Sequence, residues 1–155
     1  NNSHSKLSEK LKDHDIQRIY VAVVEGVIRE DTGKIDAPIG RHPVDRKKMA
    51  VNVKNGRRAV THFKVLERFK DTTLVELKLE TGRTHQIRVH MSYIGHPLVG
   101  DTVYGRKNLK YGFEGQALHA RVLGFMHPST GRYMEFEAEP PQIFKDLVDR
   151  LRSGV

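Results

Sequence analysis

The 155-residue sequence contains no cysteine and no tryptophan, and aromatic residues make up only 7% of it. The absence of cysteine excludes disulfide bonds, zinc sites built from thiolates and cysteine nucleophiles. No apolar run is long enough to cross a bilayer, and the sequence does not open with the charged and then apolar pattern of a secretory signal. These absences predict a cytoplasmic protein with no membrane association.

Motifs for metals and nucleotide cofactors are missing as well. The nine histidines include no His-x-x-x-His pair and no His-Glu-x-x-His motif. His85 and His90 lie five residues apart, which is a poor spacing for one face of a helix. No Walker motif or dinucleotide fingerprint occurs either. The sequence therefore favours surface or structural histidines over a metal site.

Positive charge is in excess, with 27 basic and 19 acidic residues and a net charge of +8. Residues 41–58 hold seven basic residues and only one acidic residue, a local net charge of +6. Such a stretch favours a polyanion, because phosphates that bind it release counterions. The alternative is a solvated surface loop. Within this stretch, the predicted RNA-binding residues are Arg41, Arg46, Lys47 and Lys48.

Hydrophobic spacing predicts a single α+β domain over residues 1–155, with a mixed, mostly antiparallel sheet flanked by helices. The predicted strands are 18–28, 49–53, 59–69, 72–80, 118–126 and 133–138. The predicted helices are 1–13, 84–94 and a last helix opened by Pro140 and Pro141.

Two connections are predicted from turn residues. Residues 30–44 should lack regular structure, because glycine and proline recur through them. Asn55-Gly56 should form a tight hairpin turn between strands 49–53 and 59–69, because both central residues of such a turn need a positive φ.

Residues 79–90, LETGRTHQIRVH, gather basic and amide side chains at a predicted strand-to-helix junction. Backbone N–H groups are also free at the start of a helix, so this junction can hold a carboxylate or a phosphate. The alternative is a polar helix start with ion pairs on its surface. The candidate binding residues at the junction are Arg83, His85, Gln86 and Arg88.

The same segment closely resembles the third signature motif of the RluA family of pseudouridine synthases. Other segments that resemble the family pattern, in the same order, are RIYVAVVEG (18–26), HPLVGDTVYG (96–105) and QALHARVLGFMHPSTG (116–131). The segment RHPVDRKKMAV (41–51) is similar to the RluD-like branch, which modifies large-subunit ribosomal RNA.

The resemblance implies an enzyme that isomerises uridine in RNA without a metal or organic cofactor. In this family an aspartate attacks the uridine, and the base leaves its sugar, rotates and is rejoined through carbon. By resemblance, Tyr20 packs against the target base, Arg83 pairs with the aspartate, and Leu118 is part of the apolar wall. Without that context, a tyrosine in an apolar strand, such as Tyr20, is more often a core residue, and Leu118 is a core residue on either interpretation.

The aspartate motif of the family, Arg-Leu-Asp followed by a threonine, is not in the sequence. Asp101 belongs to the 96–105 segment and is not its equivalent. We therefore expect the C-terminal part of a catalytic domain, inactive alone, without the upstream segment that bears the aspartate. With its sheet edge unpaired, the chain should either self-associate or hold the missing segment as a separate, noncovalently bound peptide. The alternative is a non-catalytic, basic RNA-binding module on the same scaffold.

Overall fold

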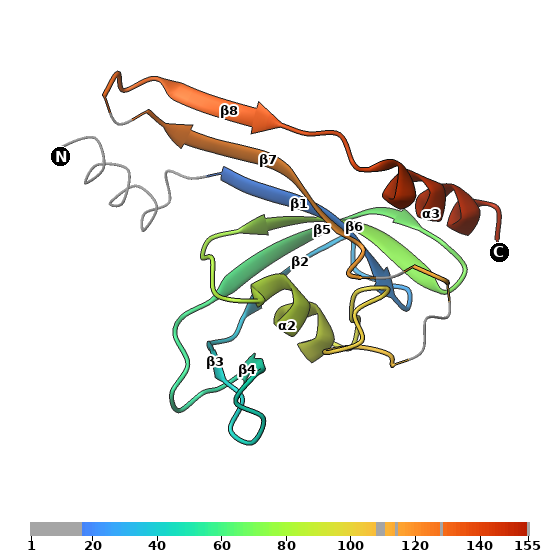
Figure 1. The fold of residues 1–155 in the computed structure, drawn as a ribbon, viewed down its shortest axis with the longest axis horizontal. Helices are drawn as coiled ribbons and strands as arrows, with labels where there is room; N and C mark the ends of the chain where they lie inside the picture. The colour runs from blue at the N-terminus through green and yellow to red at the C-terminus, as the bar shows by residue number, and fades with distance from the viewer. Residues whose placement is uncertain (1–16, 108–110, 114, 128, 155) are drawn as a thin grey trace.

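The computed structural model describes residues 17–107, 111–113, 115–127 and 129–154. The helix predicted at 1–13 lies outside these residues. Within them, six strands form one sheet in the order β2-β5-β6-β1-β7-β8, and every strand pair is antiparallel (Figure 1). The strands of this sheet are β1 (Gln17–Glu25), β2 (Thr32–Asp36), β5 (Val60–Arg68), β6 (Thr72–Leu79), β7 (Leu118–Met126) and β8 (Tyr133–Glu137). The α+β prediction, with a mostly antiparallel sheet, is confirmed.

The central strand β1 is buried on both of its faces. Ala22 and Val24 belong to the core beneath α2 (Gln86–Tyr93), whereas Val21 and Val23 belong to the core beneath α3 (Gln142–Arg152). Successive side chains of a strand point to opposite faces, so the two helices cover opposite sides of the sheet. The buried strand predicted here from its run of isoleucine and valine is confirmed.

The two helices begin where their sequences place them, with one offset. Pro141 is the residue before α3, as predicted. Helix α2 begins at Gln86, two residues later than predicted, because His85 has a left-handed φ of 55° and cannot continue a helix. Gly95, with a φ of 88°, follows the helix as its predicted terminator.

Residues 30–44 are not irregular as predicted, because they contain β2 and β3 (Ile39–Arg41). In β2, a side chain at Gly33 would collide with the ring of Phe63 on the neighbouring strand. The glycine that suggested a loop therefore permits a close approach within the sheet. Pro38 lies between the two strands rather than inside either one.

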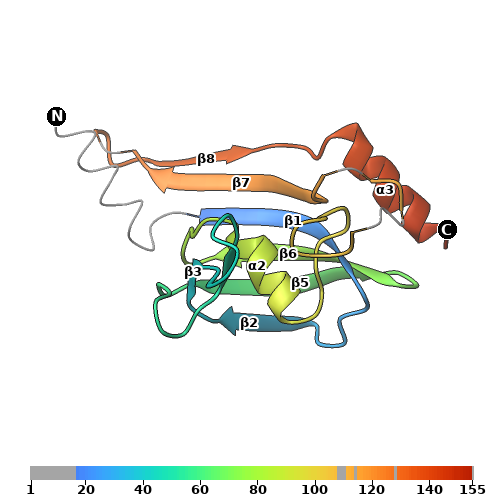
Figure 2. The same ribbon diagram turned by 60° about the horizontal axis from the view of Figure 1, so that its bottom comes forward.

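The predicted hairpin across Asn55-Gly56 is also wrong. Strand β4 (Met49–Val51) pairs with β3 in a separate two-stranded sheet beside α2 (Figures 1 and 2), and not with β5. Neither Asn55 nor Gly56 has a positive φ. Instead, Gly56 packs so tightly that an added Cβ would lie 2.3 Å from the Asn52 carbonyl oxygen.

Candidate active site

A cavity of about 360 Å³ opens where β1, the end of β6, the start of α2 and the start of β7 meet. Its lining residues are Arg18, Tyr20, Leu79, Gly82, Arg83, His85, Gln86, Ile87, Arg88 and Leu118. Six of them were singled out in the sequence, although the chain separates the first from the last by about a hundred residues. The structure therefore brings the predicted catalytic residues and the predicted junction residues into one site.

Strand pairing explains how Tyr20 and Leu118 come to line the same cavity. Ala22 lies opposite Leu118, and Tyr20 lies opposite Ala120, on the neighbouring strand. The register between β1 and β7 shifts between Ile19 and Tyr20. Such a bulge bends the strand locally and redirects side chains, which is a common feature beside active sites.

Arg83 is anchored through its Nε and through its backbone N–H. Its Nε donates a hydrogen bond of 2.8 Å to the carbonyl oxygen of Arg58, and its backbone N–H donates to Gln86 Oε1. Within the part of the chain that the structure describes, Nη1 and Nη2 have no hydrogen-bond partner. Arg83 thus presents a fixed pair of donors that matches the two oxygens of a carboxylate or phosphate.

Gln86 anchors the start of α2 to the sheet. Its Nε2 donates to Val60 O and Thr61 Oγ1, both at 3.0 Å, and its Oε1 accepts from Thr81 Oγ1 and from the Arg83 N–H. The side chain is almost fully buried and all its hydrogen-bonding atoms are occupied. Its role in substrate binding stays a prediction, while its contacts show that it positions Arg83.

His90 extends this buried network by one step. Thr61 Oγ1, which accepts from Gln86, lies 2.7 Å from His90 Nδ1, and His90 Nε2 lies 2.8 Å from the carbonyl oxygen of Ala37. A carbonyl only accepts, so Nε2 carries the proton and Nδ1 accepts from the threonine hydroxyl. Burial lowers the pKa of His90 below its ordinary value, and this outweighs the hydrogen bond to Ala37.

Arg88 lines the same cavity, but it already has a partner. Its Nε and Nη2 donate to the two carboxylate oxygens of Asp101, at 2.9 and 3.1 Å. Burial alone would raise the pKa of Asp101, but Arg88 and the amides of Tyr104 and Val103 together lower it. Asp101 is 1% exposed and does not line the cavity. These contacts give Asp101 a structural task and distinguish Arg88 from Arg83.

His85 forms the rim of the cavity next to Tyr104. Its Nδ1 lies 2.8 Å from the Tyr104 hydroxyl, and the two rings meet edge to face with centroids 5.5 Å apart. Burial, followed by the positive charge of Arg88, lowers the pKa of His85. His85 therefore adds polarity to the site at neutral pH without adding charge.

Four lining residues were missed in the sequence: Arg18, Leu79, Gly82 and Ile87. A signal existed for Arg18, because it lies two residues before Tyr20 on one strand and so shares its face. Together with Arg83 and Arg88, it is one of three arginines that line the cavity. Among the residues that the structure describes, neither aspartate nor glutamate lines it.

The predicted RNA-binding residues lie outside this cavity, in the segment 41–58, which we call the basic arm. Arg41, Arg46 and Lys47 are exposed, and Lys48 is partly buried. The loop between β3 and β4 is ordered by its own contacts, since Arg41 Nη1 donates to Arg46 O and the Lys47 N–H donates to Asp45 Oδ1. The arm is thus an organised basic surface.

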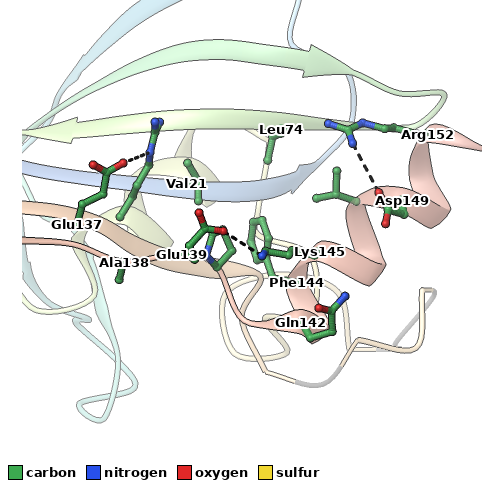
Figure 3. A pocket seen from close by; sticks show the side chains of 13 residues that line it. Val21, Leu74, Glu137, Ala138, Glu139, Gln142, Phe144, Lys145, Asp149 and Arg152 are labelled. Atoms are coloured by element: carbon green, nitrogen blue, oxygen red, sulfur yellow. Dashed lines mark hydrogen bonds and ion pairs between the residues drawn. The ribbon is translucent and has the colours of Figure 1, made fainter.

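A larger cavity of about 820 Å³ lies between the sheet and α3 (Figure 3). None of the predicted site residues lines it. Its charged groups pair with one another, as in Lys145 with Glu139 at 3.0 Å and Arg152 with Asp149 at 3.5 Å. The charged groups named here are thus already paired within the protein.

No group of three or more histidine, aspartate or glutamate side chains among the described residues could hold a metal ion. None of the helices described has the length and apolar character that a membrane span requires.

Known proteins resemble the chain over nearly all its length. The family described as RNA pseudouridylate synthase matches residues 1–93. A Bacillus subtilis (strain 168) protein named as an uncharacterized RNA pseudouridine synthase is 58% identical over 153 residues, covering 98% of this chain and 50% of that protein. The ribosomal large subunit pseudouridine synthase D of Pseudomonas aeruginosa is 51% identical over 162 residues, covering 97% of this chain and 50% of the relative.

Solved structures give the same picture. Human RNA pseudouridylate synthase domain containing 1 superposes with a TM-score of 0.75 at 27% identity, covering 98% of this chain and 70% of that one. Human RNA pseudouridylate synthase domain containing 4 gives a TM-score of 0.76 at 28% identity, covering 96% and 67%. The chain spans about half the length of the curated relatives it matches. By sequence and by fold, the chain belongs to the RNA pseudouridylate synthase family.

Proposed function

We propose that this chain supplies the uridine-binding part of the active site of an RNA pseudouridine synthase. The observation that carries the proposal is the cavity that joins an aromatic wall, Tyr20, an apolar wall, Leu118, and the guanidinium end of Arg83, which has no partner among the described residues. A uracil ring has two flat faces and polar edges, so it fits between such walls once it leaves the stack of the RNA.

The chemistry needs a carboxylate, and none lines the cavity among the described residues. A carboxylate brought beside Arg83 would be held ionised and aimed by two parallel hydrogen bonds. That arrangement suits a nucleophile that takes the base from its sugar while the base rotates and is rejoined through carbon. The proton that leaves the ring carbon balances the one gained by the ring nitrogen.

The RNA substrate we propose is large-subunit ribosomal RNA. Relatives that are 44 to 51% identical carry the name ribosomal large subunit pseudouridine synthase D. The basic arm supports the proposal, because its exposed Arg46 and Lys47 can neutralise phosphates on either side of the target.

The test is release of tritium from large-subunit ribosomal RNA labelled at carbon 5 of uridine. The 155-residue chain should release none by itself. Joined to a segment that carries the Arg-Leu-Asp motif of the family, it should release tritium, and replacing that aspartate with alanine should abolish release. Release by the chain alone would place the nucleophile within these residues. Tight RNA binding without release by the joined protein would favour the non-catalytic module.

A further inference from the structure

Apart from the uridine cavity and the cavity beside α3, a cavity of about 260 Å³ lies between the basic arm, the end of α2 and the turn after Asp101. We call it the second cavity. Its lining residues are His42, Lys48, Met49, Ala50, Val51, Val89, Ser92, Tyr93, Val103 and Tyr104. It is smaller than the roughly 300 Å³ at which pockets for drug-sized ligands begin, so it suits a single ring rather than a larger ligand.

The walls of this second cavity combine apolar surface with an exposed aromatic ring. Val89 is buried, whereas Tyr93 is 62% exposed and Val103 is 42% exposed. Tyr93 makes no ring contact with any residue that the structure describes. An aromatic face left open at the edge of an apolar hollow is the surface on which unpaired RNA bases stack.

Hydrogen-bond donors line the side formed by the arm. His42 Nδ1 accepts the backbone N–H groups of Val44 and Asp45, at 3.1 and 3.0 Å. Since Nδ1 is an acceptor, Nε2 carries the ring proton and is left as a donor. Lys48 adds an ammonium group beside it. These donors suit phosphate or carbonyl oxygens and do not suit the cationic or apolar side chains of a protein partner.

Tyr104 lines this cavity and contacts His85 and Arg88, which line the cavity that holds Tyr20 and Arg83. Its hydroxyl accepts the N–H of Met49 at 2.9 Å and lies 2.8 Å from His85 Nδ1. The Arg88 guanidinium carbon lies 4.9 Å from the centre of its ring. The Tyr104 side chain thus connects the arm to the rim of the uridine cavity.

We propose that the second cavity binds the base of an unpaired nucleotide that flanks the target uridine in the same RNA strand. This inference rests on the proposed function. The base stacks on Tyr93, and His42 and Lys48 contact its phosphate. The occupant is RNA rather than a protein segment because the arm that forms one wall carries a net charge of +6.

The experiment measures the affinity of the 155-residue chain for a fluorescein-labelled strand of ten uridines by fluorescence anisotropy. Tyr93→Ala removes the stacking ring at an exposed helix end, where alanine favours the fold. It is expected to weaken binding by about fivefold or more. Tyr93→Phe, which keeps the ring, should bind like the parent. Ile143→Ala, an equally exposed truncation on α3, is the matched control and should have no effect.

A second measurement follows the methyl resonances of Val103 by NMR as the same RNA is added. A stacked base should shift them, and Tyr93→Ala should abolish the shift. Equal affinity of Tyr93→Ala and the parent, with unmoved methyl resonances, would overturn the second site and leave the proposed function intact. Equal weakening by the alanine and phenylalanine variants would also overturn it, because stacking would then not be the cause. Failure of the parent to bind the strand would contradict RNA recognition itself.

Discussion

Arg83 and Arg88 lie five residues apart in one motif, yet their surroundings give them different tasks. The Arg88 guanidinium forms two hydrogen bonds with the carboxylate of buried Asp101. The outer nitrogens of Arg83 have no hydrogen-bond partner among the described residues. The sequence alone predicted both as binding residues. The resemblance to the family assigned the pairing with the aspartate to Arg83 alone, but the sequence did not identify Asp101, 13 residues away, as the partner of Arg88.

The buried chain of hydrogen bonds from Gln86 through Thr61 to His90 makes stability depend on pH. The pKa of His90 is lowered in the folded protein from its ordinary 6.5. Below that value the unfolded chain therefore binds more protons than the folded one, and the free energy of unfolding falls as pH decreases. His85 contributes in the same direction.

We expect the urea midpoint of unfolding to be lower at pH 5.5 than at pH 7.5. His90→Gln should be less stable than the parent at pH 7.5, by about 1 to 3 kcal/mol, because buried partners lose their hydrogen bonds. It should also lose less stability on acidification. Ring nitrogen NMR provides the control, since His90 in the folded protein should take up its second proton only at a pH below its ordinary pKa of 6.5. A pKa of His90 at or above 6.5 in the folded protein would contradict the network.

At the scale of elements, hydrophobic periodicity predicted the strands and helices whose buried side chains recur at regular intervals along the chain. The buried side chains follow the predicted spacing in the strands predicted at 18–28 and 72–80 and in both described helices. Strand β2 and the pairing of β4 were missed, because local glycine and asparagine signals carry no information about distant neighbours. Gly33 makes room for Phe63, and Gly56 packs against the backbone of Asn52, through contacts that only the tertiary fold supplies.

We expect the affinity for RNA to depend on salt concentration mainly through phosphate contacts made by the basic arm. Each phosphate contact to single-stranded nucleic acid contributes about 0.7 to the slope of log affinity against log salt. The double variant Arg46→Gln, Lys47→Gln should therefore reduce the slope by about 1.4. Lys64→Gln, Lys70→Gln, which removes the same charge from exposed positions outside the arm, is the matched control. Equal reductions by both pairs would indicate a general charge effect, and an unchanged affinity across salt concentrations would remove phosphate contact from the account.

At the scale of the whole molecule, the described sheet ends in two strands of different character. Strand β2 exposes Lys34 and Asp36 at one edge, and charge discourages further pairing. At the other edge, β7 and β8 form a long hairpin whose turn lies at the opposite end of the molecule from α3 (Figures 1 and 2). One face of this hairpin is apolar, with Leu123 directly opposite Phe136, and the two are 44% and 54% exposed.

We therefore expect the 155-residue chain to self-associate through β8. Light scattering should give a mass that rises above the monomer with concentration. Phe136→Lys should return the chain to a monomer, because a charge is introduced on the open apolar face. Thr32→Lys on the opposite edge should leave association unchanged. A parent that stays monomeric at all concentrations would contradict this prediction without bearing on the active site.

Arg83 is proposed to act on the chemical step by orienting a carboxylate. Comparing turnover with RNA binding tests this role most directly. In the chain joined to an aspartate-bearing segment, Arg83→Ala should slow single-turnover conversion of uridine by roughly a hundredfold or more, since misplacing a reacting group costs that much. Affinity for the same RNA should stay within about threefold, because the arm supplies the phosphate contacts. Equal losses of rate and affinity would contradict the claim and make Arg83 a phosphate contact.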